Sequence, residues 1–125
     1  MNTTARTPTI FVVDDNPDLR ECLCLMLEGA GMTVKAFPDG ESFLADFDVD
    51  RAGCLLIDQA MPGLSGLAVY SVLRDRGQNI PTIVLSGSLT PTIMKAAIEV
   101  GVNEILEKPI DGQRLLDGIR RLLEP

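Results

Sequence analysis

The feature that most constrains the fold of this chain is a fivefold alternation of short apolar runs with longer amphipathic ones. The short runs, at residues 9–13, 32–37, 54–57, 81–85 and 104–107, are rich in β-branched and aliphatic residues and predict strands. The first, third and fourth are almost continuously apolar, which is typical of strands covered on both faces of a parallel sheet. The second and fifth are more mixed and suit positions near a sheet edge.

Between the strands, apolar residues recur at helical spacing. The stretch after the capping residue Asn16 has Pro17 at its first helical position, and Gly29 or Gly31 can end it. The residues expected to face the core are, in chain order, Leu19, Cys22, Leu23, Met26, Leu27 and Ala30; Phe43, Leu44 and Phe47; Leu67, Tyr70 and Leu73; Ile93, Met94, Ala97 and Ile98; and Leu115, Leu116, Ile119, Leu122 and Leu123.

Alternation of strand and helix implies right-handed βαβ units, and therefore an α/β fold with a doubly wound parallel sheet and helices on both faces. A chain of 125 residues fits a single domain, which we expect over residues 9–125, after a flexible N-terminal arm at residues 1–8. In such sheets the ligand site lies beyond the carboxyl ends of the strands.

Composition excludes several classes of function. The chain has no histidine, so a Ser-His-Asp or Cys-His catalytic site, a histidine-containing zinc site and a phosphohistidine carrier are ruled out. Its three cysteines form no CxxC motif and predict buried or half-buried reduced thiols. A net charge of −7 argues against direct nucleic-acid binding. No apolar run suits a membrane helix or a signal peptide, so we expect a cytoplasmic protein.

Polar residues follow four of the five predicted strands. They are Asp14-Asp15, Asp58, Ser86-Gly87 and Lys108-Pro109. Because the carboxyl ends of parallel strands meet at one edge of a sheet, we expect these residues to gather there. Three carboxylates and one lysine leave the site negative, and close carboxylates raise one another's pKa unless a cation is present. Oxygen donors of this kind suit Mg²⁺.

Mg²⁺ beside a lysine and a hydroxyl or amide donor is a combination typical of phosphoryl-transfer sites. In such sites the protein positions the reacting groups and neutralises the negative charge on the transferring oxygens. A carboxylate can be the nucleophile and form an acyl phosphate. Asp58 is the best candidate because it ends the predicted central strand.

The chain resembles the receiver domain of two-component response regulators from about Thr9 to Leu123. The matching stretches, in family order, are Phe11-Val12-Val13-Asp14-Asp15-Asn16, Leu55-Leu56-Ile57-Asp58, Met61-Pro62-Gly63-Leu64-Ser65-Gly66, Ser86-Gly87 and Lys108-Pro109. Residues 53–58 and 62–66 look most like the FixJ-type subgroup. The resemblance implies a CheY-like, flavodoxin-like fold: a five-stranded parallel sheet in the order 2-1-3-4-5, flanked by five helices. Residues 9–125 would then be one receiver domain.

The resemblance also implies a phosphorylation-dependent switch, which catalyses only its own phosphorylation and dephosphorylation and is otherwise no enzyme. Asp58 would accept a phosphoryl group from a histidine kinase or histidine phosphotransfer protein, with Mg²⁺ or Mn²⁺ as cofactor. Asp15 would bind the metal directly and Asp14 mainly through water, while Asp58 and the backbone carbonyl of Ala60 would be further ligands. Phosphoryl oxygens would contact Ser86, the amide of Gly87 and Lys108, and the Lys108-Pro109 bond would be cis.

Three positions depart from the family pattern. Ile105 stands where the family usually has Tyr or Phe, so the usual aromatic rotamer switch is missing and Ile105 becomes a fixed apolar contact on the output face. Ser86 replaces the commoner Thr. Gln59 and Ala60 follow the acceptor, where the family tunes hydrolysis of the acyl phosphate.

Phosphorylation is expected to draw Ser86 inward and to repack the fourth helix, fifth strand and fifth helix, which would control a partner or output domain. The FixJ-type resemblance also implies a phosphorylation-dependent homodimer. Candidate residues for an exposed partner surface are Ile93, Met94, Ile105 and Leu115, although we expect at least half of them to belong to the core.

Three alternatives are weighed against this interpretation. A degenerate receiver would bind partners constitutively. Ile105 favours this alternative slightly, and the complete set of Asp14, Asp15, Asp58, Ser86 and Lys108 argues against it. A Mg²⁺-dependent phosphatase with an aspartyl nucleophile needs a second acid where Ala60 stands. A flavodoxin-like electron carrier needs a hydroxyl- and glycine-rich loop after the first strand, where Asp14 and Asp15 would repel a flavin phosphate.

Overall fold

The computed structural model describes residues 8–47 and 52–124, and strands alternate with helices throughout these ranges. Of the predicted arm at residues 1–8, all but Pro8 lie outside the described residues. The strands are β1 (Thr9–Val13), β2 (Thr33–Phe37), β3 (Ala52–Asp58), β4 (Thr82–Ser86) and β5 (Glu104–Glu107). The helices are α1 (Pro17–Gly29), α2 (Gly40–Asp46), α3 (Gly66–Asp75), α4 (Pro91–Val100) and α5 (Gly112–Leu123).

The strands form one parallel sheet in the order β2-β1-β3-β4-β5, which confirms the predicted fold class and strand order. Every residue of β1 and β4 is buried, as their continuous apolar runs predict for interior strands. The edge strands β2 and β5 expose part of their residues, in keeping with their mixed sequences. The order places β3, which ends in Asp58, at the centre of the sheet.

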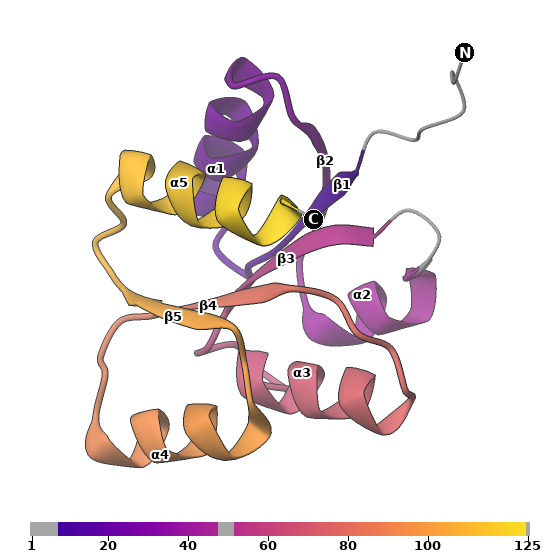
Figure 1. Ribbon diagram of the computed structural model, residues 1–125, viewed down its shortest axis with the longest axis vertical. Coiled ribbons are helices and arrows are strands. Elements are labelled where there is room, and N and C mark those ends of the chain that lie inside the picture. The colour runs from indigo at the N-terminus through magenta and orange to yellow at the C-terminus, as the bar shows by residue number, and fades with distance from the viewer. Residues whose placement is uncertain (1–7, 48–51, 125) are drawn as a thin grey trace.

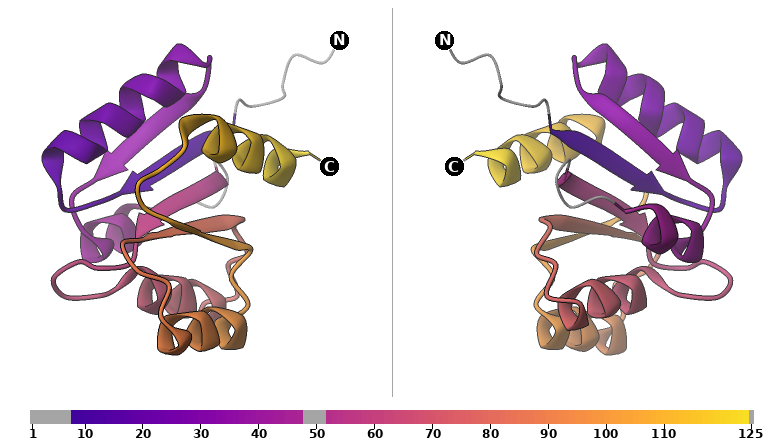
Figure 2. Two further views of the ribbon diagram at one scale, coloured as in Figure 1. Left: turned by 90° about the vertical axis from the view of Figure 1, so that its left-hand side faces the viewer. Right: turned by 90° about the vertical axis from the view of Figure 1, so that its right-hand side faces the viewer.

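Helices cover both faces of the sheet, with α1 and α5 on one side and α2, α3 and α4 on the other (Figures 1 and 2). Successive residues of a strand point to opposite faces, so β1 contributes alternately to two half-cores. Burying each large apolar side chain contributes about 1.5–3 kcal/mol to folding. The half-core under α2, α3 and α4 includes Phe11, Val13, Phe43, Leu55, Ile57, Val69, Leu73 and Val84. The half-core under α1 and α5 includes Ile10, Val12, Leu23, Leu27, Leu56, Ile83, Leu85, Leu115 and Ile119.

Each helix begins after a side chain that accepts hydrogen bonds from backbone N–H groups of its first turn. These capping residues are Asn16, Asp39, Ser65, Thr90 and Asp111. Such a cap typically contributes about 1 kcal/mol, which explains why the helices begin where they do. Within the described ranges, no helix is both long enough and apolar enough to cross a lipid bilayer.

Two predictions about helix faces are wrong. Ile98 was expected in the core but is 75% exposed, and Cys22 is also exposed. Each lies one position beside the residue that does face the core, Ala97 in α4 and Leu23 in α1. One helical position is a turn of about 100°, so the buried stripe is narrower than the apolar pattern indicates.

The other two thiols fit the prediction of unpaired, at least half-buried cysteines. Cys24 is half-buried and Cys54 is fully buried, and neither is in a disulfide. Burial raises the pKa of the Cys54 thiol to about 12, so it stays protonated and unreactive at neutral pH.

Candidate functional site

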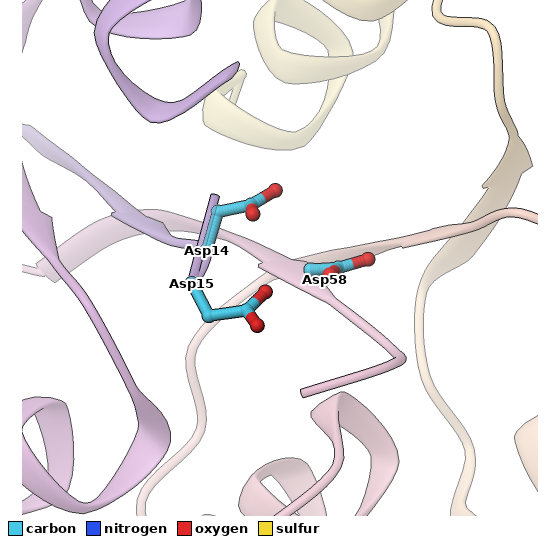
Figure 3. A group of neighbouring side chains, drawn as sticks. All are labelled: Asp14, Asp15 and Asp58. Atoms are coloured by element: carbon cyan, nitrogen blue, oxygen red, sulfur yellow. The ribbon is translucent and has the colours of Figure 1, made fainter. Parts of the chain in front are cut away.

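Three carboxylates meet at the carboxyl ends of β1 and β3 (Figure 3). Asp14 and Asp15 follow β1, and Asp58 is the last residue of β3, its direct neighbour in the sheet. One carboxylate oxygen from each residue lies within 4.8 Å of the others. Asp14 and Asp58 are buried, whereas Asp15 is exposed. The structure therefore brings together the three acids that the strand ends indicated.

The environment of Asp14 disfavours the charged form of its carboxylate. Burial raises its pKa, and the neighbouring Asp58 carboxylate raises it further. The backbone N–H of Asn16 donates to Asp14 Oδ1 over 2.8 Å and opposes this shift. The other oxygen, Oδ2, is buried and has no hydrogen-bond partner. A buried carboxylate oxygen without a partner, next to two further carboxylates, is a position that a cation would stabilise.

Lys108 follows β5 and supplies the positive charge of the site. Its Nζ donates to Asp58 Oδ1 over 2.9 Å and lies 4.0 Å from Asp14 Oδ2. Its backbone N–H donates to the Ser86 carbonyl over 2.7 Å, which fixes the lysine beside the end of β4. The Lys108–Pro109 peptide bond is cis. One lysine facing three carboxylates leaves the site with an excess of negative charge.

The hydroxyl of Ser86 is engaged within its own loop. Ser86 ends β4 and is buried; its Oγ donates to the Ser88 carbonyl over 2.7 Å and accepts from the Ser88 N–H over 3.3 Å. Gly87 between them is exposed, and a Cβ built there meets no atom within 4 Å. The fourth strand end therefore provides a hydroxyl and an uncrowded backbone amide next to the strand that carries Asp58.

The remaining predicted positions lie around these groups. Ala60 is exposed in the loop between β3 and α3. Ile105, in β5, is half-buried and packs against the half-core under α2, α3 and α4. Its apolar side chain therefore contacts the core on one side and is partly open to solvent on the other.

Two contacts of the site were missed by the sequence reasoning. Arg20 of α1 donates from Nη1 to the backbone carbonyl of Asp14 over 2.7 Å. Gln59 Oε1 accepts from the Leu67 N–H over 2.8 Å at the start of α3. The only signal for either was its place in the chain: Arg20 lies in the first turn of the helix that follows Asp14 and Asp15, and Gln59 directly follows Asp58. Long polar side chains reach in many directions, so that signal does not select a partner.

The residues present fit a hard divalent cation. Three carboxylates offer oxygen ligands in one small volume, and the exposed Asp15 leaves a side open to water. Mg²⁺ binds through a few carboxylates and keeps several waters, and Mn²⁺ accepts the same kind of donors. The acidic cluster can therefore hold such an ion.

Comparison with known proteins assigns the family. Residues 10–120 match the family model described as response regulator receiver domain. The chain is 33% identical over 119 residues to response regulator protein TodT of Pseudomonas putida, covering 95% of this chain and 52% of that protein. It is 34% identical over 115 residues to transcriptional regulatory protein FixJ of Azorhizobium caulinodans, covering 91% and 54%.

A solved structure titled as the crystal structure of FixJ-N superposes with a TM-score of 0.85 at 34% identity, covering 94% of each chain. The chain spans about half the length of the two curated relatives named above. The family match over most of the chain, the strand order and the acidic cluster agree with one another. This chain is a member of the response regulator receiver domain family of two-component signalling.

Proposed function

We propose that the chain is a phosphorylation-dependent switch that accepts a phosphoryl group on Asp58. One observation carries this choice of acceptor: Asp58 belongs to the acidic cluster and is also hydrogen-bonded to Lys108, over 2.9 Å. Its carboxylate thus adjoins both the cation site and the lysine, whose positive charges would neutralise the oxygens of a transferring phosphoryl group. Asp14 lies deeper, with one oxygen held by a backbone amide.

In the proposed reaction, an Asp58 carboxylate oxygen attacks the phosphorus of a phosphohistidine. The P–O bond forms as the P–N bond breaks, and the imidazole leaves with the electron pair and takes up a proton. Lys108 balances charge on one phosphoryl oxygen, and the Ser86 hydroxyl and Gly87 amide contact the others. The donor is a histidine kinase or a histidine phosphotransfer protein. The domain, residues 9–125, is no classical enzyme, since it acts only on its own phosphorylation state.

Bound Mg²⁺ or Mn²⁺ would supply positive charge for the phosphoryl oxygens as they transfer. Asp15 would hold the ion directly, Asp14 mainly through water, and Asp58 and the Ala60 carbonyl would complete the protein ligands. The unpartnered Oδ2 of Asp14 and the excess negative charge support this assignment. Without the ion, Lys108 would be the one cation among the described residues that is paired with the Asp14 and Asp58 carboxylates and could balance the entering phosphoryl group.

Phosphorylation adds about −1.5 to −2 charges and three acceptor oxygens beside Ser86. The Ser86 hydroxyl would exchange the Ser88 carbonyl for a phosphoryl oxygen and draw the loop before α4 inward. We propose that this movement repacks α4, β5 and α5, alters contacts with a partner or output domain, and favours a homodimer. The reactions of this switch would take place in the cytoplasm, without direct contact of this chain with nucleic acid or membrane.

The test is incubation with acetyl phosphate, with and without Mg²⁺, followed by intact-mass measurement. We expect one Mg²⁺-dependent, alkali-labile phosphoryl adduct in the natural chain and in Asp75→Asn, a control at an exposed carboxylate at the end of α3. Asp58→Asn should give none. A beryllofluoride titration followed by NMR tests the same site without a phosphodonor. No adduct and no beryllofluoride response would overturn the proposal and favour a degenerate receiver that binds partners constitutively.

A further inference from the structure

Gln59, directly after the proposed acceptor, is held at three atoms by two different parts of the chain. Its N–H donates to the Leu85 carbonyl of β4 over 2.8 Å. Its carbonyl accepts from the Gly66 N–H over 3.2 Å. Its side-chain Oε1 accepts from the Leu67 N–H over 2.8 Å. The residue between Asp58 and Ala60 is thus fixed to the neighbouring strand and to the first turn of α3.

We propose that Gln59 is a positioning residue for the metal site: its side chain ties the loop after β3 to α3, and so sets where the Ala60 carbonyl lies relative to Asp58. This rests on the proposed function, because it assumes that the Asp58 cluster binds a divalent ion. The gain is preorganisation, since a carbonyl already held in place loses little conformational freedom when it binds an ion.

Capping of α3 alone does not account for the Gln59 contact. The helix already has its own cap, because Ser65 Oγ accepts from the Ala68 N–H over 3.2 Å. The other helices are likewise capped by the residue that precedes them. Among the hydrogen bonds of the described residues, α3 alone receives an additional side-chain cap from a strand end. That extra contact connects the helix to the residue beside Asp58.

The packing at this junction leaves little room for adjustment. A Cβ built on Gly66 would lie 2.8 Å from the Asp58 carbonyl oxygen and 3.3 Å from Gln59 Cα. The first residue of α3 therefore rests directly on the backbone of the acceptor. A change in how α3 is held would be passed to Asp58 and Ala60, because no flexible side chain separates them.

The experiment compares Gln59→Met with Ser65→Ala in the full chain. Both variants lose one cap of α3, but only the first loses the side-chain hydrogen bond between residue 59 and α3. The backbone hydrogen bond from Gly66 to the carbonyl of residue 59 is present in both. Mg²⁺ alone is titrated and its dissociation constant measured from NMR shifts, and urea midpoints are measured beside it. We expect the dissociation constant to rise about tenfold in Gln59→Met, as for loss of a group that orients a metal ligand, and less than about twofold in Ser65→Ala. Hydrogen exchange at the Leu67 amide should quicken only in Gln59→Met.

A second variant, Gln59→Asn, keeps a polar side chain but withdraws the acceptor by one methylene, and it should weaken Mg²⁺ binding in the same way. Equal Mg²⁺ affinities in Gln59→Met, Gln59→Asn and the natural chain would overturn the inference and leave the proposed function intact. Equal weakening in Gln59→Met and Ser65→Ala would also overturn it, because the contact would then act through helix stability alone. Absence of Mg²⁺ binding in the natural chain would remove the proposed function as well.

Discussion

The two loops that flank Asp58 are built differently. The β3–α3 loop, residues 59–65, is anchored at Gln59 to β4 and to α3, and Gly66 at its end rests on the Asp58 carbonyl. In the β4–α4 loop, residues 87–90, the Ser86 hydroxyl bonds only within the loop, to Ser88, and the space around Gly87 is open. One side of the acceptor is close-packed and the other is not.

This difference indicates that the two loops have different roles, one in metal binding and the other in switching. A metal site benefits from ligands that do not move, and the β3–α3 loop meets that need. A switch needs an element with two arrangements of similar energy, and segments held by few contacts supply it. The β4–α4 loop meets that second need, because exchanging the Ser88 carbonyl for a phosphoryl oxygen replaces one acceptor with another. Variants in the two loops and in the acidic cluster would separate the fixed metal site from the movable switch.

The largest effect is expected from Gly66→Ala in the packed loop. The new Cβ would lie 2.8 Å from the Asp58 carbonyl oxygen, a backbone atom that cannot rotate away. Overpacking of this kind costs about 1–3 kcal/mol of the free energy of unfolding. Relief of the contact must move either α3 or Asp58, so phosphorylation by acetyl phosphate should slow as well. Urea denaturation and intact-mass time courses measure both. Natural rates and natural stability would show that the junction is looser than its geometry implies.

Asp14→Asn should stabilise the metal-free protein. The buried, unpartnered Oδ2 and its carboxylate neighbours disfavour the charged form, so removing that charge should raise the free energy of unfolding by about 1–3 kcal/mol. Saturating Mg²⁺ should stabilise the natural chain and act much less on the variant. Thermal unfolding with and without Mg²⁺ measures this. A destabilised metal-free variant would mean that the carboxylate is better compensated than its contacts show.

The pH dependence of metal-free unfolding follows from the same carboxyl. The folded-state pKa of Asp14 is raised above its ordinary value of 3.8, so the folded protein binds this proton more tightly than the unfolded chain. The Asp14 contribution to stability is therefore fully present below pH 3.8 and is lost as the pH rises through the raised folded pKa. Subtracting the Asp14→Asn profile from that of the natural chain should show this decline. A difference that rises with pH would contradict it.

Ser86→Ala should have a modest effect on stability and a selective effect on the switch. The hydroxyl makes its two hydrogen bonds to Ser88, and their loss should cost about 1 kcal/mol. Asp58 and the acidic cluster are untouched, so the phosphoryl adduct should still form. NMR shifts in α4 and β5 on adding beryllofluoride should shrink, because the Ser86 hydroxyl that would draw the loop inward is gone. Shifts as large as those of the natural chain would assign the movement to the Gly87 amide instead.

The gathering of polar residues at the strand ends was predictable from sequence, and the hydrogen bonds that the longer side chains around them make were not. Parallel topology brings the carboxyl ends of the strands together at one edge of the sheet, whichever rotamers the side chains adopt. The residues at those strand ends are Asp14, Asp15, Asp58, Ser86 and Lys108. The Gln59 contact with Leu67 and the Arg20 contact with Asp14 depend on rotamers of long side chains. Those rotamers are determined by neighbouring groups that come together only in the folded protein.

The wrong helix-face assignments have a related cause. Cys22 and Ile98 are apolar enough to continue the stripes on α1 and α4, but each helix buries a narrow line along the sheet. Which apolar neighbour falls on that line depends on how the helix rotates against the sheet, and one-dimensional spacing does not fix that rotation. Strand burial was easier to predict, because both faces of the interior strands are covered.

Gly87→Ala is the counterpart of Gly66→Ala in the open loop, and its effect should be the smallest. The added Cβ meets no atom within 4 Å, and the φ of Gly87 lies outside the left-handed region, so alanine fits without strain. Because alanine restricts the unfolded chain, the free energy of unfolding should be unchanged or higher by up to about 1 kcal/mol. The backbone amide remains, so adduct formation and Mg²⁺ affinity should match the natural chain. If Gly87→Ala impaired Mg²⁺ binding as much as Gly66→Ala, the open loop would also belong to the metal site. If Gly87→Ala instead lost only the NMR response to beryllofluoride, the assignment of the switch to the β4–α4 loop would be strengthened. The new methyl group would then lie in the path of the moving loop.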